Sequence, residues 1–328
     1  MNEIRVEFPE FRSLLGSLFE DFIIEKMALG NRFMAGSQIL IRFDRFLAAK
    51  GLETPTLPRF LVEEWLKRRE YESAKTQRKR FNLTRQFAEH LALRGYDVHI
   101  PDSTHQPIVR DDFAPYIFSY EEIRQFFIAV DQLPSTARSP YRHIIIPQLF
   151  RLLYGCGLRI GEAVRLTRSD VDLKRGILTI RNSKFGKSRL VPMAPTLTVR
   201  LKRMLGQLDR MTSQTHVFPG RCDGHIIRDT VYLIFRDTLW KIGISHRGRS
   251  KGPCLHDLRH TFACHRLAKW YREGDDLSAK LPVLAAYMGH KTFFGTQRYL
   301  HLTLDLGVDL TKRLDQLHGF IIPKEVDS

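Results

Sequence analysis

The stretch Leu255-His256-Asp257-Leu258-Arg259-His260-Thr261-Phe262, followed later by Gly289-His290 and Arg298-Tyr299, decides how this chain is interpreted. Arginines and histidines that converge on one point make a cationic pocket, which suits an oxyanion or a phosphate. A tyrosine beside such a pocket can act as a nucleophile through its hydroxyl. Cations and a tyrosine without an obvious metal-ligand set predict covalent phosphoryl transfer.

Length and charge limit the class of protein. The 328 residues suffice for two ordinary domains. Lysine and arginine total 52 against 36 acidic residues, which gives a formal net charge of +16 and a pI near 9.9. Such an excess favours a polyanionic partner, most often nucleic acid. A basic protein of membrane surfaces is the alternative, but we find no lipidation signal and no apolar run of roughly 20 residues that could span a membrane.

The N-terminus and the cysteines indicate the compartment. Residues 1–5, MNEIR, lack the basic-then-apolar form of a signal peptide. The four cysteines (Cys156, Cys222, Cys254 and Cys264) include no close pair. We therefore expect free thiols in a reducing compartment, the cytoplasm.

Helical periodicity predicts a first domain over residues 1–97, with four helices between 12 and 97. In the fourth helix Leu83, Phe87 and Leu91 share an apolar face. Such a helix carries either a solvated charged face or one that contacts phosphates, and the net charge favours contacts with DNA. The candidate DNA-binding residues of this helix are Lys75, Arg78, Lys79, Arg80 and Arg85.

Three prolines in a polar stretch predict a linker over 98–116, which leaves 117–328 as a second domain. There, helices dominate and two short strands, 177–180 and 189–192, flank a turn that contains Lys184 and Lys187. The predicted fold class is therefore mainly helical with a small antiparallel sheet. Arg159 follows a glycine turn at the start of a helix, where an anion can bind. Arg247, Arg249 and Lys251 lie in a glycine-rich loop suited to backbone phosphates.

In this order, Arg159, Lys184, His256-x-x-Arg259, His290 and Tyr299 resemble the tyrosine recombinase (phage integrase) family, which cuts and rejoins DNA through a phosphotyrosine. The matching pieces are Gly157-Leu158-Arg159-Ile160-Gly161-Glu162, the Lys184 hairpin that closes on Val191-Pro192, His256-Asp257-Leu258-Arg259-His260, Met288-Gly289-His290 and Gln297-Arg298-Tyr299. The four N-terminal helices resemble the family's core-binding domain. Two departures are Cys156, where the family often has threonine, and the bulky pair Phe293-Phe294.

The resemblance implies a role for each site residue. Tyr299 would be the nucleophile that forms a 3′-phosphotyrosyl bond. Arg159 and Arg259 would hold the non-bridging oxygens, and His290 would hydrogen-bond one of them. His256 would accept the tyrosine proton, Lys184 would protonate the leaving 5′-oxygen with Lys187 as a competitor for that role, and Glu162 would orient His256 or an arginine. His260 and His265 are interpreted as ordinary structural histidines.

The resemblance further implies a site-specific recombinase of a mobile element. It would act on double-stranded DNA as a tetramer, with room for accessory proteins, at the nucleoid of a bacterial cytoplasm. Neither a cofactor nor a metal is expected. His256 and His260 have the i, i+4 spacing of a zinc helix, but Arg259 between them would repel a cation. A leucine-rich pattern after Tyr299 (Leu310, Leu314, Leu317 and Ile321) predicts a short amphipathic helix that docks on its own domain or on the next protomer.

Two other functions stay open at this point. A type IB topoisomerase uses similar residues to relax supercoils without exchanging partners, and a basic DNA-binding protein could have lost its activity. Integrase, resolvase and transposon recombinase are not distinguished, and the target DNA sequence is not readable from the chain.

Overall fold

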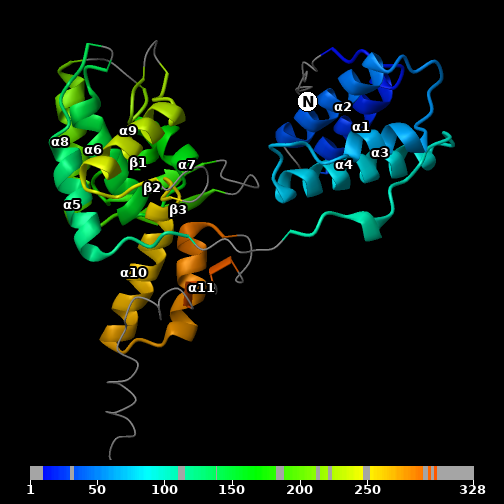
Figure 1. Ribbon diagram of the computed structural model, residues 1–328. Coiled ribbons are helices and arrows are strands. Elements are labelled where there is room, and N and C mark those ends of the chain that lie inside the picture. The colour runs from blue at the N-terminus through cyan, green and yellow to red at the C-terminus, as the bar shows by residue number, and fades with distance from the viewer. Residues whose placement is uncertain are drawn as a thin grey trace, which may run out of the picture. The chain divides into compact units, whose positions relative to one another are not determined.

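The computed structural model describes residues 10–29, 33–109, 115–137, 139–181, 188–211, 215–220, 224–246, 252–290, 295–296 and 299–300. The chain divides into two compact units, residues 1–113 and 114–328, which we describe separately. Figure 1 labels their helices and strands.

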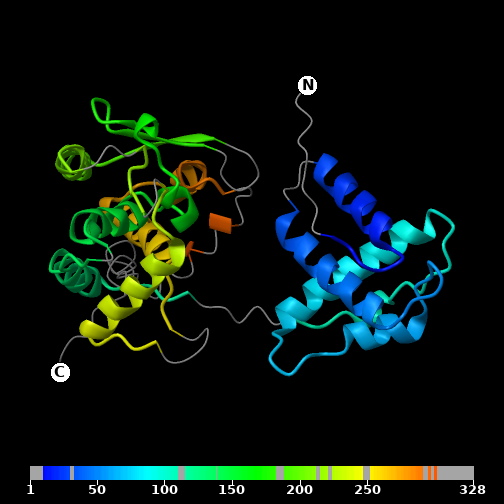
Figure 2. The same ribbon diagram turned by 90° about the horizontal axis from the view of Figure 1, so that it is seen from above.

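The first unit is a helical bundle around an aromatic core. Its helices are α1 (Gly16–Ala28), α2 (Met34–Ala49), α3 (Arg59–Leu66) and α4 (Ala74–Ala92), as the periodicity predicts. Figure 2 shows them packed side by side. The rings of Phe19 and Phe87 stack with their centroids 4.1 Å apart, and Phe43 stacks on Trp65 at 4.9 Å. Residues after α4 also contact this unit, because Val98 bridges Leu57 and Gln106 donates to Asn82; a short 3₁₀ turn, η1 (Ser103–His105), lies between them.

The second unit combines helices with one small sheet. Among the described residues its helices are α5 (Tyr120–Asp131), α6 (Arg142–Gly155), α7 (Ile160–Val164), α8 (Pro195–Asp209), α9 (Arg228–Lys241), α10 (Asp257–Glu273) and α11 (Leu277–Met288). The antiparallel sheet has the order β1 (Val171–Asp172), β2 (Ile177–Ile180), β3 (Arg189–Pro192). Sequence periodicity predicts β2 and β3. The two-residue β1, which follows the 3₁₀ turn η2 (Arg168–Asp170), is too short to carry a period. The predicted fold class, mainly helical with a small antiparallel sheet, is confirmed.

The core of the second unit forms around α6, which packs against α5, α8 and α10. Its Leu149, Phe150 and Leu152 are fully buried. A separate apolar cluster lies between α10 and α11 and includes Tyr299. Among the described candidate site residues, Arg159 and Glu162 lie at the start of α7, His256 and Arg259 at the start of α10, and His290 just after the end of α11.

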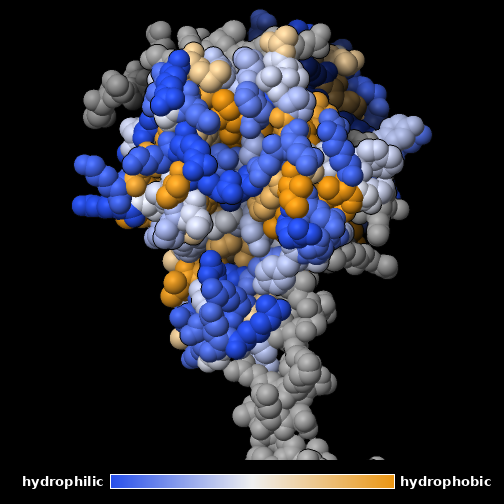
Figure 3. All heavy atoms as spheres, turned by 90° about the vertical axis from the view of Figure 1, so that its left-hand side faces the viewer, coloured by the Kyte–Doolittle hydropathy of each residue, from blue (hydrophilic) through white to orange (hydrophobic). Residues whose placement is uncertain are grey.

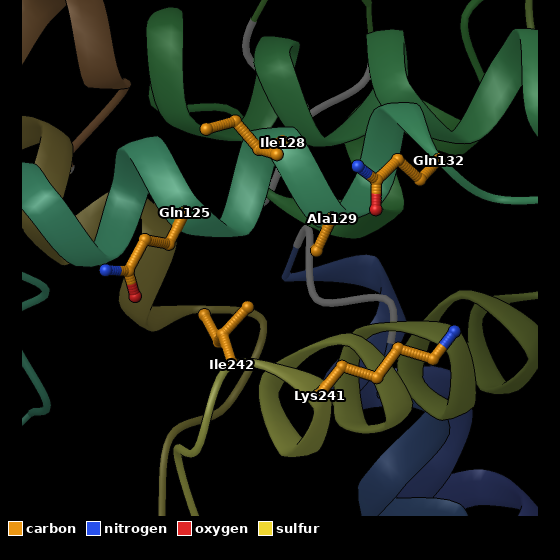
Figure 4. Close-up of a pocket in the computed structure, with 6 residues that line it drawn as sticks. All are labelled: Gln125, Ile128, Ala129, Gln132, Lys241 and Ile242. Atoms are coloured by element: carbon orange, nitrogen blue, oxygen red, sulfur yellow. The ribbon is translucent and has the colours of Figure 1, made fainter.

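Beyond this site, the described surface of the second unit has hollows that hold no candidate site residue. The face in Figure 3 is mostly hydrophilic with scattered apolar side chains, which is ordinary for a protein surface. A hollow between α5 and the end of α9 is lined by Gln125, Ile128, Ala129, Gln132, Lys241 and Ile242, none of which is a candidate site residue (Figure 4). Across the described part of the chain, no helix has both the length and the apolar character that crossing a membrane requires.

Candidate active site

Arg159 is positioned by a tight turn and by the short helix α7. Gly157 has φ +58, and a Cβ there would come within 2.5 Å of the Phe262 ring, so the turn requires glycine. Glu162 accepts from the backbone N–H of Arg159 at 3.1 Å, which caps α7. The Arg159 guanidinium donates to Glu162 at 2.8 Å and to the carbonyl of Gly289 at 3.1 Å. The arginine therefore joins α7 to the end of α11.

Glu162 holds two arginines at once. Arg189, on β3, donates to both carboxylate oxygens at 3.1 and 2.9 Å, in addition to the contact from Arg159. Burial raises the pKa of Glu162, but the hydrogen bonds and charges of Arg189 and Arg159 outweigh burial and lower it to about 2. The sequence interpretation expects Glu162 to orient either His256 or an arginine. Its described hydrogen bonds from side chains come from Arg159 and Arg189. Arg189 is missed by the sequence reasoning, because an arginine that begins an edge strand carries no local signal.

The C-terminus of α11 gathers three arginines. Gly289 ends the helix with φ +69, and the last carbonyls point outward without intrahelical partners. The carbonyl of Tyr287 accepts from Arg189 at 2.8 Å and that of Met288 from Arg259 at 2.7 Å. The carbonyl of Gly289 accepts from Arg159, as described above. The negative end of the helix dipole thus stabilises a cluster of positive charge.

Arg259 is a buried cation without an acidic partner in the described part of the chain. Its side chain is 1% exposed, and it donates to the carbonyls of Gly157 and Met288. Its buried Nε has no hydrogen-bond partner among the described residues, and no described carboxylate forms an ion pair with it. Burial, and then the charge of Arg159, lower the pKa of Arg259. Because a buried unpaired charge costs several kcal/mol, this position is complementary to an anion.

Two neutral histidines lie in the field of these arginines. Burial, followed by the charges of Arg259 and Arg159, lowers the pKa of His256 to about 4 and that of His290 to about 3. Both rings are therefore neutral at pH 7 and able to donate a hydrogen bond. His290 also pairs with the hydroxyl of Thr296 at 2.7 Å. Arg159, His256, Arg259 and His290 form one cluster.

Tyr299 belongs to the same cluster. It is 2% exposed, its ring is stacked on that of His290 with centroids 6.1 Å apart, and its phenolate charge would act on Arg259. Its hydroxyl lies 2.8 Å from Nδ1 of His260. The sequence interpretation treats His260 as an ordinary structural histidine. In the structure its ring nitrogen contacts the Tyr299 hydroxyl. The position of His260 directly after the HxxR motif gives no sequence signal for its contact with Tyr299.

The other candidate residues are placed as follows. Lys184, Lys187, Arg247, Arg249 and Lys251 lie outside the described residues, as does the predicted helix after Tyr299. Lys75, Arg78 and Lys79 are exposed on α4, and Arg85 is half-buried, bonded to Glu89 and to the carbonyl of Pro101.

The position of Arg80 differs from the expectation that its side chain is available to contact DNA. It is 3% exposed, pairs with Glu72, donates to the carbonyl of Lys67 at 3.0 Å and lies over the ring of Trp65. Its charge is used within the bundle, because the turn after α3 brings Glu72 onto the inner side of α4. Arg80 is therefore not retained among the residues proposed to contact DNA.

Within the described residues no cluster of three histidine, cysteine, aspartate or glutamate side chains is arranged to hold a metal ion. Cys156, Cys254 and Cys264 form no disulfide among the described residues. Cys222 lies outside the described residues.

Comparison with known proteins now adds to this geometry. The phage integrase family model matches residues 119–305. The putative integrase/recombinase y4rB of Sinorhizobium fredii is 32% identical over 302 residues, which cover 90% of this chain and 96% of that protein. Tyrosine recombinase XerC of Chromobacterium violaceum is 34% identical over 154 residues, 47% of each chain.

Solved structures show the same fold. The Tn1549 transposon integrase in complex with transposon right end DNA gives a TM-score of 0.62 at 17% identity, over 91% of this chain and 98% of that one. The XerH site-specific recombinase bound to its difH substrate gives 0.58 at 17% identity, over 87% and 79%. The architecture is that of the tyrosine recombinases. The chain belongs to the phage integrase family, and it is an enzyme of the site-specific recombinase type.

Proposed function

We propose that this protein recombines specific DNA sites by cleaving and rejoining strands through a 3′-phosphotyrosyl bond to Tyr299. The observation that carries the proposal is Arg259, a buried cation that lacks a described carboxylate and lies beside a buried tyrosine. A phosphodiester would supply the missing negative charge at the place where a hydroxyl nucleophile is available. The Tn1549 integrase and XerH structures, both solved with DNA, support a DNA partner.

In the proposed reaction, the oxygen of Tyr299 bonds to phosphorus and the bond to the 5′-oxygen breaks. Arg159 and Arg259 hold the non-bridging oxygens, where charge builds up in the transition state. His256 and His290, kept neutral by burial and then by the charges of the arginines, donate hydrogen bonds to the same oxygens. Lys184 protonates the leaving oxygen, and Glu162 holds Arg159 in place. The ester retains the bond energy, so rejoining needs no ATP.

The remaining parts of the proposal concern the assembly. The exposed Lys75, Arg78 and Lys79 of the first unit would contact DNA phosphates, as would the basic loop at 246–252. Four protomers would exchange strands in a synaptic complex in the bacterial cytoplasm, without metal. Excess chelator should therefore leave cleavage intact.

The test starts from a pool of randomised duplexes. Wild-type protein incubated with this pool should retain DNA covalently on a denaturing gel, and sequencing that DNA identifies a captured duplex. Tyr299→Phe should bind the captured duplex with wild-type affinity and form no adduct, because only the hydroxyl is lost. An adduct formed by the phenylalanine variant would show that another residue is the nucleophile. Relaxation of supercoils without joining of two sites would instead indicate the topoisomerase alternative.

A further inference from the structure

Tyr299 contacts a histidine to which the proposed reaction assigns no role. The hydroxyl of Tyr299 and Nδ1 of His260 are 2.8 Å apart, and the two residues are 39 positions apart in the chain. Both are buried, at 2% and 7% exposure. A contact at this distance between two buried side chains is shielded from competing water, so it defines where the hydroxyl points.

Attack on phosphorus requires that the phenol lose its proton. With an ordinary pKa near 10, only about one tyrosine in a thousand is ionised at pH 7. A base must lie within roughly 2.6–3.2 Å of the hydroxyl oxygen to remove that proton directly. His260 satisfies this distance, and a neutral imidazole with its proton on Nε2 presents the Nδ1 lone pair to the hydroxyl.

The two motif histidines are less suited to this step. Nδ1 of His290 is paired with Thr296, and its ring lies nearly parallel to that of Tyr299, at 21°. His256 lies edge-on to His260 with ring centroids 4.7 Å apart. Burial, and then the charges of Arg259 and Arg159, lower the pKa of His256 and make it a poor proton acceptor.

We infer that His260 is the catalytic group that takes the proton of Tyr299 during cleavage and returns it on rejoining. The inference rests on the proposed role of Tyr299 as nucleophile. In the forward step the tyrosine O–H bond breaks, Nδ1 of His260 gains the proton, the phenolic oxygen bonds to phosphorus, and the 5′-oxygen leaves with a proton from Lys184. In the reverse step the 5′-hydroxyl gives its proton to Lys184 and bonds to phosphorus, and the imidazolium proton returns to the tyrosine oxygen as the bond between that oxygen and phosphorus breaks. Arg259, whose charge interacts with that of Tyr299, stabilises the developing phenolate.

The same helix provides a matched control. His265 lies on α10 like His260, is 6% exposed, and its Nδ1 is 2.9 Å from the hydroxyl of Tyr154. It is therefore a buried histidine–tyrosine pair of the same kind, made with a tyrosine that the reaction does not use. His260→Phe and His265→Phe remove the same group from the same helix.

The experiment measures single-turnover adduct formation on a nicked form of the captured duplex, whose released end diffuses away. His260→Phe should be slower by roughly a hundredfold or more, as expected when a general base is lost. His265→Phe should react at the wild-type rate. Binding to the intact duplex and the thermal unfolding midpoint are recorded for each variant. If His260→Phe does not fold, His260→Asn replaces it, because the amide keeps a hydrogen bond to the hydroxyl but cannot take a proton.

The pH profile separates a base from a structural residue. Two described groups could add their own titrations, His256 beside His260 and His290 beside Tyr299, and the charge of Arg259 also acts on Tyr299. The rate of the His260 variants should rise with pH more steeply than the wild-type rate, because the variants depend on hydroxide to take the phenolic proton. Trifluorotyrosine in place of Tyr299, with its more acidic hydroxyl, should restore much of the rate in the His260 variants.

Each other outcome has a definite meaning. A wild-type rate for His260→Phe, while Tyr299→Phe forms no adduct, overturns the inference and leaves the nucleophile in place. A slow His260→Phe or His260→Asn whose pH profile parallels that of wild type makes His260 merely structural and also overturns it. If His256→Asn, and not His260→Asn, acquires the alkaline rise, His256 is the base. An adduct with Tyr299→Phe contradicts the proposed function itself.

Discussion

At the scale of single residues, the site is a balance between buried charges. Glu162 is 6% exposed and carries the one carboxylate that pairs with Arg159 and Arg189 in the described structure. Arg259 has no such partner there. Arg259, whose charge acts on Tyr299, is thus the position where the proposed phosphate would supply a negative charge.

Replacing Glu162 by Gln should remove a pH-dependent contribution to stability. The pKa of Glu162 is lowered from 4.5 to about 2 in the folded protein, so the contribution is fully present above pH 4.5 and is lost as the pH falls toward 2. This lowering of the pKa corresponds to about 3 kcal/mol of unfolding free energy, because each tenfold change in a proton equilibrium is worth about 1.4 kcal/mol. Urea unfolding at pH 7 and pH 3 measures it. Wild type should lose more unfolding free energy between these two values than Glu162→Gln, and an equal loss would contradict the assignment.

At the scale of elements, two helices set the geometry. His256, Arg259 and His260 stand at i, i+3 and i+4, so one face of the start of α10 carries all three. The C-terminus of α11 meets this face with three successive carbonyls, each bonded to an arginine. Figure 1 shows the two helices side by side. The arginine cluster therefore depends on where α11 ends.

Gly289→Ala should disturb that end of the helix. Gly289 has φ +69, where an alanine costs about 1–2 kcal/mol, and a Cβ would lie 2.9 Å from the Arg189 guanidinium. We expect a lower unfolding midpoint together with slower adduct formation, since the carbonyls that hold three arginines shift. Gly243, with φ +79 and open space around its Cβ, is the matched control. Gly243→Ala should cost similar stability without slowing cleavage; slowing in both variants would remove the special role of Gly289.

At the scale of the whole molecule, the net charge of +16 is the dominant property. All candidate catalytic residues belong to the unit 114–328, while the basic face of α4 belongs to the unit 1–113. This division suggests that the first unit contributes affinity and the second unit contributes chemistry.

Salt dependence tests that division. The triple variant Lys75→Ala, Arg78→Ala, Lys79→Ala should weaken binding to any duplex and reduce the slope of log affinity against log salt by about 3, roughly one per lost phosphate contact. Arg80→Ala is the control, because its guanidinium pairs with Glu72 inside the bundle. It should lower stability and leave the slope unchanged. A slope that falls only in the Arg80 variant would reverse the assignment.

The sequence by itself determined what depends on local order along the chain. Helical periodicity located the helices of both units, and the Ser119–Glu122 capping box is formed as its spacing predicts. The order of Arg159, His256-x-x-Arg259, His290 and Tyr299 indicated the family before any contact was known. These features can be predicted from the sequence because a helix repeats its faces every three or four residues, and because each motif consists of residues that are close together in the chain.

Only the tertiary structure decided which side chains meet across long stretches of chain. It buried Arg80 in the bundle against Glu72, paired Arg189 with Glu162, and placed Nδ1 of His260 within hydrogen-bond distance of the Tyr299 hydroxyl. Arg159 and the carbonyl of Gly289 are 130 residues apart. No local pattern encodes such a pair, since the same arginine on the same helix face can be solvated or buried. Its partner is selected by the packing of α7, β3, α10 and α11, which brings buried charges together and requires each to find a counter-charge, a carbonyl or a bound anion.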